Sequence, residues 1–145
     1  MSIDVAALVE AARSARAQAH APYSGFAVGA AIVDADGRVV TGANFENASY
    51  GLSLCAETVA ITAANAAGLL AGAEAIAVVG GKAGEADCTV ATPCGRCRQM
   101  LHEAERIAGR SIAIYCAPVS GQGMDGVVAY SLAELLPHAF GPDSI

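Results

Sequence analysis

Three cysteines and one glutamate in two short segments are the residues of this chain best suited to chemistry. The first segment is Cys55-Ala56-Glu57, and Pro93-Cys94-Gly95-Arg96-Cys97 follows downstream. Cysteine thiolates bind zinc, and three protein ligands leave the fourth tetrahedral position open, as in catalytic rather than structural zinc sites. The remaining carboxylate, Glu57, would be free to move protons. The two segments therefore predict zinc as the cofactor, Cys55, Cys94 and Cys97 as its ligands, and Glu57 as the catalytic residue.

The spacing of these residues also indicates a reaction. Cys94 and Cys97 are three residues apart at an expected helix start, so their side chains share one face, and the potential of a helix N-terminus favours thiolates. Zinc lowers the pKa of water at its open position to about 7. Glu57 would take a proton from that water, which attacks an electrophilic ring carbon, and would pass the proton to a ring nitrogen and the departing amine. This is hydrolytic deamination, the chemistry of zinc deaminases that carry a Pro-Cys-x-x-Cys motif.

A closed structural zinc site is the alternative that the spacing leaves open. A fourth ligand from Cys88, Cys116 or His102 would complete the coordination shell. The protein would then be an inert, zinc-stabilised binding protein, which is the hypothesis from a different functional class. That interpretation leaves Glu57 without a role.

Composition and charge narrow the class of partner. The chain has 145 residues, of which 54% are apolar and 15% charged, and its net charge is -6. Binding to a nucleic-acid backbone needs Lys and Arg, so we expect a small-molecule substrate and no nucleic acid. From its residue pattern we expect neither a membrane-spanning stretch nor a signal peptide, and its five cysteines suit metal binding better than disulfides. We therefore expect a cytoplasmic protein with no membrane contact.

The apolar pattern predicts helices that alternate with strands. Expected helices cover about residues 4–19, 53–67 and 92–107, with a C-terminal helix opened by the capping-box spacing of Ser131 and Glu134. Expected strands cover residues 26–33, 39–46, 75–79, 111–116 and 126–130. This order predicts an α/β fold, a three-layer α/β/α sandwich with a mixed five-stranded sheet, in a single domain over residues 1–145. The last two strands should be antiparallel, because the connection between them is too short for a parallel crossover.

Five sequence blocks extend over nearly the whole chain. They are PYSGFAVGAA at 22–31, NFENASYG at 44–51, CAE at 55–57, PCGRCRQ at 93–99 and LLPHAFG at 135–141. Together and in this order they resemble the small homotetrameric class of the cytidine deaminase family. The resemblance implies a zinc-dependent enzyme of pyrimidine salvage. It would convert cytidine and 2′-deoxycytidine to uridine and 2′-deoxyuridine with release of ammonia.

The resemblance also implies which residues meet the nucleoside. Asn44 and Glu46 would hydrogen-bond the ribose 3′-hydroxyl, since alternate residues of a strand point the same way. Phe26 would pack against the pyrimidine ring. From the residues alone, Asn44 and Glu46 could instead hold the turn that leaves the hairpin, and Phe26 could be a core residue.

Two further roles concern the base and the neighbouring subunits. The backbone of Ala56 would hold the base edge together with Glu57. Tyr50 and Phe140 would reach the site of a neighbouring subunit, so that active sites are shared across the homotetramer. A C-terminal phenylalanine that covers the core of its own chain is the alternative for Phe140.

Thr58 departs from the family's pattern, which usually has Arg directly after Cys-Ala-Glu. Three thiolates leave a zinc site with a net charge near -1, which the family's Arg is thought to offset, whereas Thr58 donates at most one neutral hydrogen bond. One hypothesis is that the helix N-termini, with Arg96 or Arg98, supply the compensation. Another is that the smaller residue admits N4-substituted cytosines. The second hypothesis keeps open a deaminase of N4-modified cytosine nucleosides or of an aminopyrimidine antibiotic such as blasticidin S.

Overall fold

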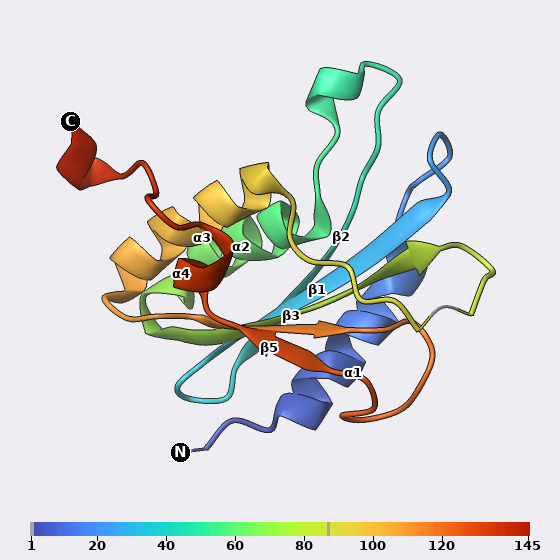
Figure 1. Cartoon of the computed structure of the whole chain (residues 1–145), viewed down its shortest axis with the longest axis horizontal. Helices are drawn as coiled ribbons and strands as arrows, with labels where there is room; N and C mark the ends of the chain where they lie inside the picture. The colour runs from blue at the N-terminus through green and yellow to red at the C-terminus, as the bar shows by residue number, and fades with distance from the viewer. Residues whose placement is uncertain (1, 87) are drawn as a thin grey trace.

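A mixed sheet of five strands forms the centre of the computed structural model, which describes residues 2–86 and 88–145 (Figure 1). Its strands, in the spatial order β2-β1-β3-β4-β5, are β1 (Phe26–Asp34), β2 (Val39–Ala43), β3 (Ala73–Lys82), β4 (Ala113–Ala117) and β5 (Val128–Tyr130). β3 and β4 pair in parallel, and the other neighbouring pairs are antiparallel. The expected mixed sheet is therefore confirmed, including the antiparallel pairing of the last two strands.

Helices cover both faces of this sheet. In Figure 1, α1 (Val5–Ala15) lies on one side, and α2 (Ala56–Ala66) and α3 (Gly95–Ala108) lie on the other. Successive side chains of β1 point to opposite faces of the sheet and so contact both helical layers. Ala30 and Ile32 pack into the core under α2 and α3, whereas Ala31 and Val33 pack against α1. The three-layer arrangement is thus confirmed. The short α4 (Leu132–Leu135) follows β5 and begins with the predicted capping box at Ser131.

The length and apolar character of the helices show whether any of them could span a membrane. Within residues 2–86 and 88–145, no helix has the length and apolar character needed to cross a bilayer.

α2 and α3 begin later than the sequence predicts. Ser53 and Thr92 are suitable N-cap residues, but both hydroxyls have other partners. The Ser53 hydroxyl accepts a loop N–H at 3.0 Å, and the Thr92 hydroxyl accepts from the Arg98 guanidinium at 3.2 Å. Cys55 and Cys94 are the N-caps instead, and neither side chain caps its helix. The predicted helix starts are therefore wrong, and two of the candidate zinc ligands occupy the helix tips.

Gly42 on β2 lets α2 lie close to the sheet. A Cβ at this position would lie 2.7 Å from the carbonyl oxygen of Ala56 and 2.6 Å from the backbone nitrogen of Ala60. Only glycine permits so close an approach without displacing the helix. Since Cys55 and Glu57 stand at the N-terminus of α2, Gly42 sets how far these two residues lie from the sheet.

Candidate active site

The sulfur atoms of Cys55, Cys94 and Cys97 form one group at the N-terminal ends of α2 and α3. All three lie within 4.8 Å of one another, and those of Cys55 and Cys94 are 3.7 Å apart. Two sulfurs bound tetrahedrally to one zinc ion at about 2.3 Å lie about 3.8 Å apart, so the spacing fits a shared ion. Among the described residues, no fourth Cys, His, Asp or Glu joins the group. This arrangement agrees with the predicted open site rather than with a closed structural one.

The pKa values of the Cys55 and Cys97 thiols are shifted in opposite directions. The hydrogen bond from Cys97, with smaller contributions from Cys94 and the positive charge of Arg96, lowers the pKa of the Cys55 thiol to about 6, although burial opposes the shift. The pKa of Cys97 is raised, because its thiol bonds to Cys55 and is buried. The group thus retains a proton that a divalent ion bound to all three sulfurs would displace.

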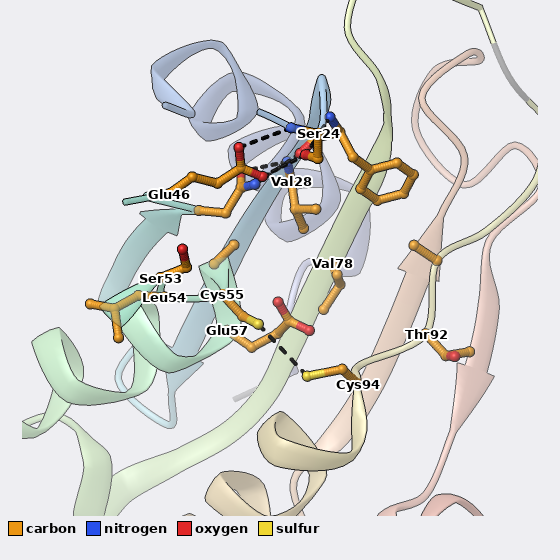
Figure 2. Close-up of a pocket in the computed structure, with 14 residues that line it drawn as sticks. Ser24, Val28, Glu46, Ser53, Leu54, Cys55, Glu57, Val78, Thr92 and Cys94 are labelled. Carbon is orange, nitrogen blue, oxygen red and sulfur yellow. Dashed lines mark hydrogen bonds between the residues drawn. The ribbon is translucent and has the colours of Figure 1, made fainter. Parts of the chain in front are cut away.

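Glu57, the second residue of α2, stands beside this group. Its side chain is only 4% exposed. Burial, with a smaller contribution from the nearby Cys55 charge, raises the pKa of its carboxyl to about 7. A carboxyl that titrates near neutrality can both take and return a proton. Figure 2 shows the Glu57 carboxyl next to Cys55 and Cys94, at one end of a pocket.

That pocket is a cavity of about 290 Å³, lined by 14 residues (Figure 2). It runs from the sulfur group towards the start of β1, where Ser24 and Glu46 stand at its other end. Its volume suits a small molecule. Most of the predicted site residues line it, namely Phe26, Asn44, Glu46, Cys55, Ala56, Glu57 and Cys94.

Asn44 and Glu46 hold the backbone around the cavity as well as lining it. The Asn44 side chain accepts a hydrogen bond from the Val28 nitrogen at 2.9 Å and donates one to the Phe26 carbonyl at 2.8 Å. The Glu46 carboxylate accepts from the backbone N–H groups of residues 23 and 24, at 3.0 and 3.1 Å. These bonds hold the segment that leads into β1, and none of them goes to the turn that follows Glu46. Each of the two residues also has capacity left for a ligand, since an amide carries two N–H donors and a carboxylate about four acceptor sites.

Tyr50 and Phe140 do not line the cavity that contains Glu57. Their side chains are 75% and 62% exposed, respectively. Tyr50 lines a neighbouring hollow that shares Ser24, Glu46 and Ser53 with the main cavity. Phe140 is held through its carbonyl, which accepts a hydrogen bond from the Gln99 side chain at 2.8 Å.

Sequence reasoning missed several apolar residues of the cavity wall. Val28 lies two residues after Phe26 on β1, so strand alternation could have identified it. Val78 lies on β3, whose sequence predicted a buried strand but not its neighbours in the sheet. Gly80, also on β3, makes room for the cavity wall, because a Cβ there would lie 3.0 Å from Val28 and 3.2 Å from the Phe26 ring.

Comparison with known proteins agrees with this geometry. The family model for the cytidine and deoxycytidylate deaminase zinc-binding region matches residues 2–113, which include all three cysteines of the sulfur group. The chain belongs to this family.

Individual relatives support the same assignment. A cytidine deaminase of Mycobacterium tuberculosis (strain CDC 1551 / Oshkosh) is 44% identical over 137 residues, which cover 92% of this chain and 87% of that protein. The crystal structure of cytidine deaminase from Burkholderia pseudomallei matches with a TM-score of 0.77 at 44% identity, over 92% of this chain and 97% of that one. The crystal structure of cytidine deaminase from Mycobacterium tuberculosis matches with a TM-score of 0.72 at 39% identity, and the match covers 97% of this chain and 99% of that one.

These matches confirm the family resemblance, and with it the enzyme class. The family is one of zinc-binding deaminases, and Cys55, Cys94 and Cys97 form the group in this chain that could hold the zinc ion.

Proposed function

We propose that this chain catalyses the zinc-dependent, hydrolytic deamination of cytidine and 2′-deoxycytidine to uridine and 2′-deoxyuridine, with release of ammonia. The observation that carries the proposal is the buried Glu57 carboxyl beside a three-sulfur group, inside the cavity of a member of this family. A zinc ion held by the three sulfurs would supply the polarised water for the hydrolysis, because zinc lowers the pKa of bound water to about 7.

Glu57 is the residue that moves protons in this proposal. Its carboxylate takes a proton from the attacking water and delivers it to the ring nitrogen beside the reacting carbon. Glu57 then takes the second proton from the oxygen that has added to the ring carbon and delivers it to the exocyclic amine. The C–N bond breaks, ammonia leaves, and the ring keeps the oxygen as a carbonyl. Burial of Glu57 keeps bulk water from competing for these protons.

The other lining residues orient the nucleoside. Phe26, which lines the cavity, packs against the pyrimidine ring, and the backbone of Ala56 holds the base edge together with Glu57. Asn44 and Glu46 hydrogen-bond the ribose 3′-hydroxyl with the capacity that their backbone contacts leave free. Both residues line the cavity on the side of β1 and β2.

The charge of the cavity favours nucleosides over nucleotides, although the family includes deoxycytidylate deaminases. None of the described residues that line it is Lys or Arg. Glu46 instead places a carboxylate at the end away from the sulfur group (Figure 2). The lining residues therefore offer a 5′-phosphate no counter-charge, and phosphate recognition depends on one.

We also propose a homotetramer whose active sites are shared between subunits. The exposed rings of Tyr50 and Phe140 support this assembly, because large exposed aromatic side chains are typical of interfaces. Cysteines that are free and grouped for a metal fit a reducing compartment. We therefore propose that the enzyme acts in the cytoplasm, in pyrimidine salvage.

An absorbance assay tests the proposed function. Substrates are cytidine, 2′-deoxycytidine, free cytosine and 2′-deoxycytidine 5′-phosphate, each with and without a zinc chelator. We expect turnover of the two nucleosides, its loss with the chelator, and its return when zinc is added back. Turnover of none of the cytosine nucleosides would refute the function, and faster turnover of the phosphate would refute the nucleoside preference. Light scattering tests the assembly, and a monomer at all concentrations would contradict it.

A further inference from the structure

The negative charge around the zinc-binding group needs a partner. Three thiolates with one zinc ion carry a net charge of about -1, and the Glu57 carboxyl stands beside them in a buried position. Uncompensated charge away from water is costly. A cation close to the three sulfurs would therefore strengthen metal binding.

The Arg98 guanidinium is not available for this role, because its hydrogen bonds go to other groups. It donates to the carbonyls of Pro93 and Leu135 at 2.7 and 2.8 Å, and to the Thr92 hydroxyl at 3.2 Å. These bonds tie the C-terminal segment to the start of α3. The Thr58 hydroxyl does lie 3.5 Å from the Cys97 sulfur, but it is neutral.

Arg96 is placed differently. It stands in the first turn of α3, between Cys94 and Cys97. Its guanidinium reaches across to the segment before α2 and donates to the Ser53 carbonyl at 3.3 Å, two residues before Cys55. A guanidinium carries five N–H donors, so this contact leaves donors and the full positive charge beside the Cys55 segment.

We propose that Arg96 is a positioning residue of the zinc-binding site, which holds the Cys55 segment against the start of α3 and offsets the charge of the three thiolates. The proposal rests on the zinc site of the proposed function. Arg96, an exposed residue of α3, would supply the positive charge that the neutral Thr58 hydroxyl near Cys97 does not supply. Removing the charge should therefore weaken metal binding even before any substrate is present.

The test compares Arg96→Gln, Arg96→Lys and the control Arg106→Gln. Arg106 lies on the same helix, is also exposed, and pairs at 3.4 Å with Asp143 rather than with the site. Zinc affinity is measured by competition with a chromophoric chelator, and the thiolate-to-metal absorption of the Co²⁺-substituted proteins reports the geometry of the sulfur group. Thermal melting of the metal-free proteins checks that each variant folds.

We expect Arg96→Gln to weaken zinc binding by about 10- to 100-fold, as losses of groups that support metal ligands typically do, and to shift the Co²⁺ absorption. Arg96→Lys should recover part of the affinity, and Arg106→Gln should match the parent. Parent-like affinity in Arg96→Gln, or an equal loss in Arg106→Gln, would overturn the proposal. If the parent binds zinc with this pattern of variants but deaminates no nucleoside, the proposed function fails and the role of Arg96 stands.

Discussion

Replacing Gly42 with alanine should move the catalytic end of α2. The added Cβ would lie 2.6 Å from the Ala60 nitrogen and 2.7 Å from the Ala56 carbonyl oxygen. Ordinary contact begins at about 3.4 Å. Both partners are backbone atoms of α2, so no side-chain rotation relieves the clash. The N-terminus of α2 must therefore retreat from β2 by roughly 0.7 Å.

That shift is large on the scale of the site. Cys55 and Glu57 would move with α2, whereas Cys94 and Cys97 stay with α3. The 3.7 Å between the Cys55 and Cys94 sulfurs, which matches a shared zinc ion, would change with it. Overpacking of this kind costs about 1–3 kcal/mol of stability. A misplacement near 1 Å costs up to about 10²-fold in rate, so we expect kcat/KM for cytidine to fall by about 10- to 100-fold.

The assay pairs thermal melting with steady-state kinetics and zinc titration. Gly72→Ala is the matched control, because its Cβ would meet only the Asp34 Cβ at an ordinary 3.6 Å. The melting temperature of Gly42→Ala should fall by roughly 3–4 °C for each kcal/mol lost. The reasoning is refuted if Gly42→Ala loses stability yet keeps the kcat/KM and zinc affinity of the Gly72→Ala control.

Two other substitutions test a buried ion pair at the end of β1 and the wall of the cavity. Asp34→Asn should cost about 1–3 kcal/mol, because the buried carboxylate accepts hydrogen bonds from Arg38 and from the Asp36 nitrogen. Burial raises the pKa of the Asp34 carboxyl, but the hydrogen bonds and charge of Arg38 lower it more, so the pKa lies below its unfolded value of 3.8. The stability that the carboxylate contributes is therefore present above pH 3.8 and is lost as the pH falls below that value. The melting temperatures of parent and variant should differ at neutral pH and converge as the pH falls to about 3. A difference that stays constant with pH would contradict the stabilising role of the ionised Asp34 carboxylate. Gly80→Ala should crowd the Phe26 ring and raise KM for cytidine more than it lowers kcat, and an unchanged KM would argue against a Phe26 contact with the base.

The sequence predicted the zinc-binding group because its ligands follow local rules. A Cys-x-x-Cys pair in the first turn of a helix presents both sulfurs together whatever the rest of the fold does. Cys55 joins that pair only because α2 packs beside α3. The residue types suggested this convergence and the family resemblance supported it, but spacing along the chain does not determine it. The structure places all three sulfurs within 4.8 Å of one another.

The errors arose where local preference and tertiary structure compete. Ser53 and Thr92 are better N-cap residues than cysteine, but their hydroxyls bind a loop N–H and Arg98 instead. The cavity wall formed by Val78 and Gly80 was not predicted either, because the position of β3 next to β1 is a property of the sheet order. Sequence periodicity indicates that a strand is buried, but it does not give the neighbours of that strand.

Glu57→Gln tests the central claim most directly, because it replaces the proton-moving carboxyl by a neutral amide of the same shape. The measurement is the zinc content of the purified variant together with its turnover of cytidine. The account predicts parent-like zinc content and melting temperature, and a rate lower by at least about 10²- to 10⁴-fold. A variant that binds zinc, folds like the parent and still turns over cytidine near the parent rate would contradict the role of Glu57 and the mechanism built on it.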